Sequence, residues 1–469
     1  MFHRLIPFVG ILVMVALCLA ISKDRRAALK RWPLIAWGLG LQFGFALLIL
    51  TNEPGRWVFQ VFNDVFVAVA NCTKDGAAFV FGDQLTNPMT GLGYFAFFVL
   101  PTIIFFSALT AILYQVGILQ RVVKGIAWVM ARTMKTSGAE TLSASANIFV
   151  GQTEAPLMVR PFIGKMTDSE LMTVMTGGFA TVAGSVMAAY IFFLQDSVPN
   201  IAGHLLAASV MSAPAALLFG KLIVPETGTP ETYGNLNVEM PKAYENTMDA
   251  AAGGAAEGVK LALNVGGMII AFLALLALVN LILQAIVGVP SVFTEGGFEL
   301  DKSVTIQGIL GDILAPLAWL MGIPWDEAPT AGQYMGLKTI TNEFVAFAQF
   351  ADAQKVPGEA VSSRTAIILT YALAGFANIG SIGIQIGGLM IMAPERRADL
   401  ARLGFLAMIA GTLACNSTGC VAAILTPMNT ERPSAVVQTL AEPDAAEEIV
   451  EDLLTGEDDK TTATEPLSP

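Results

Sequence analysis

The stretch SANIFVGQTEAP, residues 145–156, decides how this chain folds. It places Glu154 inside a semi-apolar segment that is broken by a glycine and a proline. A second stretch, TNEFVAF at residues 341–347, places Glu343 among apolar and aromatic residues. Carboxylates are almost never fully buried unless they are paired. Each glutamate therefore needs a partner, a cavity or a ligand, and both are candidate binding residues.

The composition around these stretches is that of a membrane protein. The chain of 469 residues is 54% hydrophobic and 14% charged, whereas a soluble protein has about 25% charged residues. Residues 431–469 carry eleven of the acids and two of the bases, so most of the net charge of −12 lies there. The nearly neutral remainder excludes nucleic acid as an electrostatic partner. Two histidines, and cysteines without Cys-x-x-Cys spacing, leave little for a catalytic triad or a soft-metal site.

Apolar runs of about 20 residues predict membrane-spanning helices. The eight segments that qualify are approximately 5–22, 33–50, 91–117, 169–195, 202–223, 261–289, 365–393 and 403–427. A basic cluster, not a small-residue cleavage site, follows the first run, which predicts a retained helix. Basic clusters after the first and third spans, and between the seventh and eighth, predict which loops are cytoplasmic. Both termini are then external.

Two further segments, about 138–163 and 326–351, are too short and too polar to be ordinary spans. Irregular backbone at membrane depth is tolerated only where protein or a water-filled cavity surrounds it. Both segments are therefore predicted to be re-entrant helical hairpins. The amphipathic segments 121–135 and 306–323 are predicted to be interfacial helices.

The order of interfacial helix, acidic hairpin, broken span and further span occurs twice along the chain. GFATVAGSV at 178–186 resembles GFANIGSIG at 375–383, and AWVMA at 127–131 resembles AWLMG at 318–322. One membrane-depth glutamate lies between the members of each pair, and the two copies begin on opposite sides of the membrane. Inverted repeats of this kind place a binding site near the midplane, at discontinuous helices. The alternative is chance similarity between spans rich in small residues.

The predicted fold class is an all-α polytopic membrane protein with eight transmembrane helices, two re-entrant hairpins in an inverted-topology repeat, and interfacial helices. Its predicted parts are residues 1–90 (helices 1–2 and an external amphipathic segment), 91–224 (first repeat), 225–260 (cytoplasmic loop), 261–428 (second, inverted repeat) and 429–469 (acidic, disordered tail).

The first hairpin offers a mixed set of polar groups. Gln152, Thr153 and Glu154 supply an amide, a hydroxyl and a carboxylate in sequence, with no lysine or arginine at the same place. This set suits a neutral ligand rich in hydrogen-bonding groups. The competing interpretation is a structural ion pair between Glu154 and Arg160.

The second repeat offers Asn378, which lies between Gly375 and Gly380 and invites a helix break. Ser381 follows one turn later, and Phe376 could stack on a ligand ring. The competing interpretations are hydrogen bonds between packed helices for the polar pair and core packing for the phenylalanine.

The first repeat also supplies oxygen atoms for a cation. The Thr181 hydroxyl, the Asn147 side chain and carbonyls at Val150, Val182 and Ala183 could form a small cage. Oxygen-only ligands suit a hard cation such as Na⁺.

At these residues the chain resembles the concentrative nucleoside transporter family. The resemblance is carried by the segments 137–161, 175–191, 341–347 and 375–388 and covers about residues 1–428. It implies a homotrimer in the bacterial inner membrane that carries uridine, cytidine or adenosine. By matched position it implies base contacts at Gln152, Thr153, Glu154 and Val186, ribose contacts at Glu343, Asn378 and Ser381 with Phe376 nearby, and a sodium site at Asn147, Val150, Thr181 and the following carbonyls.

The sequence and this resemblance together predict a secondary active symporter, not an enzyme. It would import nucleosides by alternating access, driven by a sodium gradient. The resemblance also implies that a transport domain of hairpins and broken spans moves against a scaffold built on the third and sixth spans. The alternatives are proton coupling, a channel lined by the two hairpins, and an intramembrane enzyme with Glu154 and Glu343 as an acid/base pair.

Overall fold

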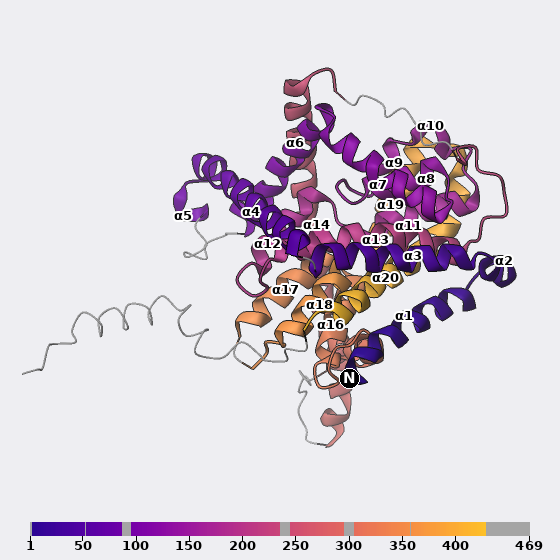
Figure 1. Cartoon of the computed structure of the whole chain (residues 1–469). Helices are drawn as coiled ribbons and strands as arrows, with labels where there is room; N and C mark the ends of the chain where they lie inside the picture. Colours follow the sequence, from indigo (N-terminus) through magenta and orange to yellow (C-terminus); the bar gives the residue numbers. More distant parts are fainter. Residues whose placement is uncertain are drawn as a thin grey trace, which may run out of the picture.

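The computed structural model describes residues 2–51, 53–86, 95–234, 244–294, 304–356 and 358–427. Within these ranges the chain is helical between its turns and contains no β-sheet (Figure 1). The predicted acidic tail at 429–469 lies outside the described residues. An all-helical fold with several apolar helices agrees with the predicted class.

The first half of the chain contains α1 (Phe2–Ala20), α2 (Arg25–Lys30), α3 (Trp32–Leu50), α4 (Glu53–Phe81), α5 (Asp83–Thr86), a π-helical turn (Phe95–Val99), α6 (Leu100–Gln115), α7 (Ile118–Met134), α8 (Gly138–Ala146), α9 (Glu154–Leu157), α10 (Arg160–Ile163), α11 (Asp168–Ala180), α12 (Gly184–Leu194) and α13 (Ile201–Ile223).

The second half contains α14 (Thr247–Thr294), α15 (Ile306–Leu320), α16 (Ala328–Ile340), α17 (Glu343–Lys355), α18 (Ser363–Leu373), α19 (Ile379–Met392), a short 3-10 turn (Pro394–Arg396) and α20 (Arg397–Leu425).

Six helical stretches of the described chain are long and apolar enough to cross a membrane. They are Trp32–Leu50, Phe95–Gln115, Asp168–Leu194, Ile201–Ile223, Thr247–Ile286 and Pro394–Leu425. Each overlaps one of the eight segments expected from the sequence. Of the other two expected segments, the first corresponds to α1, whose apolar part is shorter. The second, 365–393, is not one helix but two, α18 and α19. Eight crossings and two re-entrant hairpins stay predictions.

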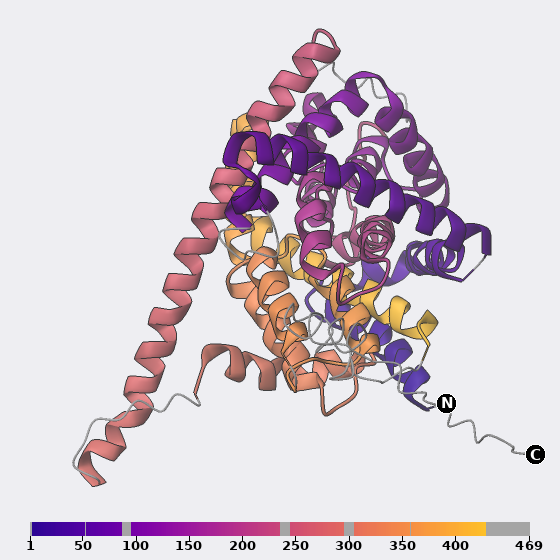
Figure 2. The same cartoon turned by 90° about the vertical axis from the view of Figure 1, so that its left-hand side faces the viewer.

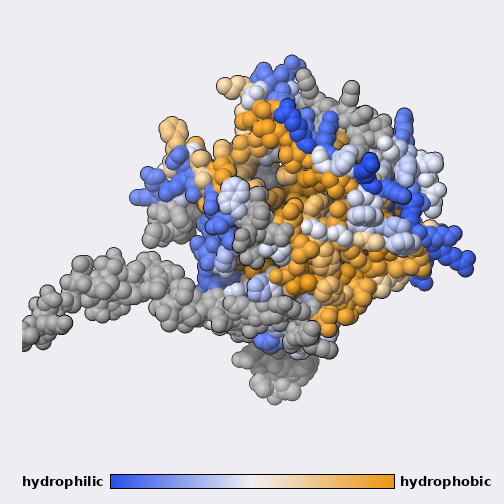
Figure 3. All heavy atoms as spheres, in the orientation of Figure 1, coloured by the Kyte–Doolittle hydropathy of each residue, from blue (hydrophilic) through white to orange (hydrophobic). Residues whose placement is uncertain are grey.

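Much of the outer surface is made of exposed apolar side chains. Figure 2 shows α14 as one long rod along the side of the molecule, and Leu263 and Ile270 on it are 71% and 74% exposed. Much of the face seen in Figure 3 is apolar as well. Apolar patches of this extent face a lipid phase or a partner subunit rather than water.

The two predicted hairpin segments are helical pieces joined by turns. In the first, the side chain of Ser137 and that of Glu140 form a capping box at the start of α8, and residues 147–153 turn the chain toward α9 and α10. In the second, α16 packs against α17 and the Asn342 side chain accepts the Val345 N–H at 2.9 Å. This cap restarts the helix at Glu343 immediately after the turn.

The two broken helices meet in the interior. α11 ends at Ala180 and α12 begins at Gly184, whereas α18 ends at Leu373 and α19 begins at Ile379. The Cys415 thiol of α20 lies 3.5 Å from the Ala180 carbonyl and 3.3 Å from the Ala374 carbonyl. One side chain therefore contacts the ends of both α11 and α18.

The last part of segment 225–260, which was predicted to be a loop, is helical, because α14 begins at Thr247. Its small residues allow close packing on α6: a Cβ on Gly254 would lie 2.8 Å from the Ala108 Cα, and one on Gly258 would lie 2.6 Å from the Ile104 Cα. Helix packing at this distance stabilises a segment whose glycines disfavour an isolated helix.

Candidate functional site

The Glu343 carboxylate is the centre of a buried hydrogen-bond group. Glu343 starts α17 and is 4% exposed. Its Oε1 accepts from the Tyr190 hydroxyl at 3.0 Å, and its Oε2 accepts from the Asn378 Nδ2 at 2.9 Å. The structure thus brings together the start of α17, the break before α19 and the helix α12.

Asn378 has two roles in this group. Its Oδ1 accepts the Ser381 N–H at 2.8 Å and so caps α19, while its Nδ2 faces Glu343. The cap explains why the break is stable, because it satisfies one of the free N–H groups at the helix start. The predicted pair Asn378 and Ser381 is therefore brought together, with the Ser381 side chain buried on the first turn of α19.

Tyr190 is a site residue that the sequence interpretation missed. Its ring stacks on Phe347 at 4.5 Å between centroids and meets Phe344 edge-on at 4.9 Å. A buried tyrosine hydroxyl normally finds a partner, which here is Glu343. The available signal was its place one turn after the predicted base contact Val186, which is buried on the same helix.

The turn of the first hairpin lies against both broken helices. Gln152 is 7% exposed, and its Oε1 has no hydrogen-bond partner among the described residues. A Cβ on Gly178 of α11 would collide with the Gln152 side chain, and one on Gly388 of α19 would collide with Thr153. These glycines let the turn approach the two helices closely.

Glu154 has a different environment from Glu343. Its side chain is exposed and folds back over Gly151. The competing interpretation of Glu154 was a structural ion pair with Arg160. This pair does not occur among the ion pairs of the described chain. The first hairpin therefore presents a carboxylate without a basic partner beside a buried amide oxygen that needs a donor.

Gln385 is a second residue that the sequence interpretation missed. It is fully buried on α19, its Nε2 donates to the Met175 carbonyl of α11 at 2.9 Å, and its Oε1 has no partner in the described chain. A Cβ on Gly178 would meet Gln385 as well as Gln152. The two amides therefore lie on the same side of Gly178. The only signal in the sequence was its place one turn after Ser381.

Two of the predicted cation ligands, Asn147 and Thr181, lie near the same residue, Gly177. Asn147 is fully buried; its Nδ2 donates to the Ser143 carbonyl at 3.1 Å, and its Oδ1 has no partner in the described chain. A Cβ on Gly177 would lie 3.2 Å from the Asn147 Nδ2. The Gly177 carbonyl accepts the Thr181 hydroxyl at 2.9 Å. The Thr181 oxygen keeps its acceptor capacity in this arrangement.

One backbone contact holds the hairpin turn against the break of α11 and α12. The Gly184 N–H donates to the Phe149 carbonyl at 2.9 Å, next to Val150 on one side and Ala183 on the other. No cluster of three histidine, cysteine or carboxylate side chains occurs in the described ranges. An orphaned buried oxygen among neutral oxygen donors fits a small, hard monovalent cation, and it does not fit a transition metal.

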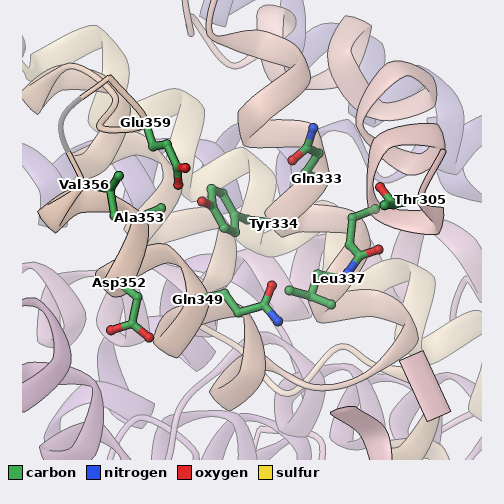
Figure 4. A pocket seen from close by; sticks show the side chains of 10 residues that line it. Thr305, Gln333, Tyr334, Leu337, Gln349, Asp352, Ala353, Val356 and Glu359 are labelled. Carbon is green, nitrogen blue, oxygen red and sulfur yellow. The ribbon is translucent and has the colours of Figure 1, made fainter. Parts of the chain in front are cut away.

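A cavity of ≈ 430 Å³ opens beside the second hairpin and is separate from these residues (Figure 4). Tyr334, Gln349 and Glu359 are among its lining residues, and none of the predicted site residues is. Phe376, the predicted aromatic contact, is buried in the break before α19 instead.

Three family models match the chain in succession. Residues 9–84 match the Na⁺ dependent nucleoside transporter N-terminus, residues 96–197 match a nucleoside recognition (Gate) domain, and residues 204–423 match the Na⁺ dependent nucleoside transporter C-terminus. The chain belongs to the sodium-dependent nucleoside transporter family. The family resemblance expected from the sequence is confirmed.

Curated relatives agree with this membership. The mouse sodium/nucleoside cotransporter 1 is 41% identical over 435 residues, and the human sodium/nucleoside cotransporter 1 is 40% identical over 443 residues. Each match covers 90% of this chain and 64% of the relative, so the chain spans less than two thirds of their length. These relatives are transporters, not enzymes.

Solved structures match over nearly their full length. CNTnw in an inward-facing substrate-bound state has 40% identity and a TM-score of 0.79, and the match covers 92% of this chain and 99% of that one. A doubly substituted variant of CNTnw in an outward-facing state has 41% identity and a TM-score of 0.81, and the match covers 91% and 99%. That protein has been seen in outward-facing, intermediate and inward-facing states.

Proposed function

We propose that this protein is a sodium-driven symporter that imports nucleosides across the inner membrane of a bacterium. The observation that carries the proposal is the buried Glu343 carboxylate, which Tyr190 and Asn378 hold next to the break between α18 and α19. A carboxylate in this setting is costly unless it serves a ligand. The family membership supplies the ligand class.

The ribose would bind at the second repeat. Glu343 accepts hydrogen bonds from vicinal hydroxyls, and the amide of Asn378 can donate to one hydroxyl oxygen while Ser381 lies on the adjacent turn. Phe376 lies between α18 and α19 and would bound the sugar on its apolar face. These roles account for why so many polar groups converge on one buried carboxylate.

The nucleobase would bind at the first hairpin. Gln152 and Glu154 present an unpartnered amide oxygen and an unpaired carboxylate, and both accept from the N–H groups of a base. Thr153 packs on α19, and Val186 is buried on α12, where it would contact the base. Amides and carboxylates serve purine and pyrimidine edges alike, so uridine, cytidine and adenosine are the expected substrate class.

Sodium would bind at the Asn147 Oδ1, the Thr181 hydroxyl and the carbonyls of Val150, Val182 and Ala183. A bound monovalent cation would supply the positive charge that these oxygens lack. Asn147 and Gln152 belong to the same turn, so ordering the turn for the ion also positions the base contacts. Coupling requires that ion and nucleoside each bind more tightly when the other is present.

Transport would proceed by alternating access in a homotrimer with external termini. The hairpins and broken helices pack on one another and would move as one unit, against a scaffold made by α6 and α14. The exposed apolar side of α14 leaves room for lipid or for a neighbouring subunit (Figure 2).

Uptake of labelled uridine into proteoliposomes tests the function. We expect saturable accumulation under an imposed Na⁺ gradient and none under a H⁺ gradient. Glu343→Gln should abolish it, while Asp352→Asn, an exposed carboxylate on the same helix, should leave it unchanged. Uptake that needs no ion gradient would support a channel, and chemical turnover of uridine would support an enzyme. Either result would overturn the proposal.

A further inference from the structure

Lys338 is a buried lysine that the proposed transport mechanism does not yet use. It lies on the last turn of α16 and is 3% exposed. Its Nζ donates to the Ala372 carbonyl, near the end of α18, at 2.9 Å. A buried charge of this kind persists only where its surroundings offset the loss of water.

The end of a helix offsets this loss of water around the Lys338 ammonium. The last carbonyls of α11 and α18 have no partners within their helices and carry partial negative charge. Cys415 contacts both ends, at Ala180 and at Ala374, so the two regions of negative potential adjoin. A cation next to each end is therefore favoured.

The two repeats meet this requirement differently. At the end of α18, the Lys338 ammonium is hydrogen-bonded to a carbonyl of the last turn. At the end of α11, the buried polar group offered by the hairpin is an oxygen, the Asn147 Oδ1, which has no partner in the described chain. One repeat thus contains its own cation, and the other contains an acceptor for one.

The two residues occupy equivalent places in the repeat. Asn147 follows Trp128 by 19 residues, and Lys338 follows Trp319 by 19 residues. Asn147 is the C-cap of α8, the first helix of its hairpin, and Lys338 lies in the last turn of α16, the first helix of the other. Position and packing partner therefore correspond, while the chemical group differs.

We propose that the Lys338 ammonium is a tethered cation that takes, in the second repeat, the place that sodium takes in the first. This inference rests on the proposed sodium site at Asn147. A covalently held charge cannot leave, so the second hairpin stays ordered throughout the cycle. Only the first hairpin then depends on a mobile ion, and the protein binds one sodium per nucleoside.

A reciprocal exchange of the two residues tests this assignment. Uridine affinity is measured by calorimetry on the full-length purified protein at increasing Na⁺, with choline holding the ionic strength constant. The logarithm of affinity should rise with the logarithm of Na⁺ concentration at a limiting slope near one in the unsubstituted protein. The shift in Tm caused by Na⁺ without uridine gives a second readout that does not depend on transport.

Lys338→Asn installs the residue of the first repeat. We expect uridine affinity at low Na⁺ to fall by about tenfold or more, to recover at high Na⁺, and to follow a limiting slope near two. Lys338→Met supplies no oxygen, so its affinity should fall without recovery and its slope should stay near one. Lys338→Arg keeps a cation and should keep the slope of one.

Asn147→Lys is the converse exchange. It should bind uridine in choline alone, with a slope near zero and no Na⁺-dependent shift in Tm. Gel filtration and the Tm in choline establish that each variant is folded, and if one exchange fails to fold, the other decides. Lys338→Asn behaving like the unsubstituted protein, or like Lys338→Met, would overturn the tethered-cation role. Sodium-independent binding by the unsubstituted protein would instead overturn the proposed function.

Discussion

Tyr190 and Glu343 lie 153 positions apart and share a hydrogen bond of 3.0 Å. It joins α12 to the start of α17. A hydrogen bond to a charged group contributes about 1.5–3 kcal/mol when it is buried. This contact therefore connects two distant segments of the chain at the proposed ribose site.

Tyr190→Phe should weaken uridine binding by about tenfold or more, because it removes one donor from the buried carboxylate. The ring contacts with Phe344 and Phe347 remain, so the variant should fold. Calorimetric titration of uridine measures the effect. Tyr233→Phe, at an exposed tyrosine, is the matched control. An unchanged affinity in Tyr190→Phe would separate this tyrosine from the site.

Gly178→Ala should abolish nucleoside uptake, because its Cβ would collide with both Gln152 and Gln385. Gly383→Ala on α19 adds the same methyl group where no atom lies within 4 Å, and it should retain uptake. Both variants are assayed in proteoliposomes after gel filtration. Equal uptake in the two would show that close approach at Gly178 is not required.

Asn147→Ala should eliminate the stabilisation of the purified protein by sodium, because it removes the orphaned oxygen from the proposed cation site. The Tm is measured in NaCl and in choline chloride of equal ionic strength. A protein that binds a ligand only when folded gains about 2.7 kcal/mol at one hundred times the dissociation constant. A full sodium response in the variant would contradict the assignment of Asn147.

Asp168→Asn should lower thermal stability modestly. Asp168 lies 2.7 Å from Arg402, 3.5 Å from Arg396 and 3.7 Å from Lys23, and it links the start of α11 to that of α20. Partly exposed pairs contribute about 0.2–1 kcal/mol each and are screened by salt. The difference in Tm between the variant and the unsubstituted protein should therefore become smaller when the salt concentration is raised from about 20 mM to about 1 M. Glu231→Gln, in an exposed pair with Lys165, is the control.

Much of the fold could be predicted because its signals are local. Apolar runs predicted the spanning helices, and a glycine, a proline or an asparagine in such a run predicted where a helix breaks, as at Asn378. The start of α14 could not be predicted this way. Its glycines disfavour an isolated helix, and only packing on α6 compensates for them.

The candidate site was predicted in part for the same reason. Glu154 and Glu343 could be singled out because a carboxylate in an apolar segment is costly wherever the segment packs. Tyr190 and Gln385 could not be singled out, because a tyrosine or a glutamine in a helix commonly has a purely structural role. Their partners, Glu343 and the Met175 carbonyl, lie 153 and 210 positions away.

The sequence by itself determined the membrane class, the places of the apolar helices and the residues whose burial requires a partner, because these depend on composition and spacing along the chain. Only the tertiary structure decided which partner each one has. It set Glu343 against Tyr190 and Asn378, and it set Lys338 against the end of α18. Hydrogen bonds between helices depend on distances of a few ångströms, which follow from how side chains pack and not from their separation in sequence.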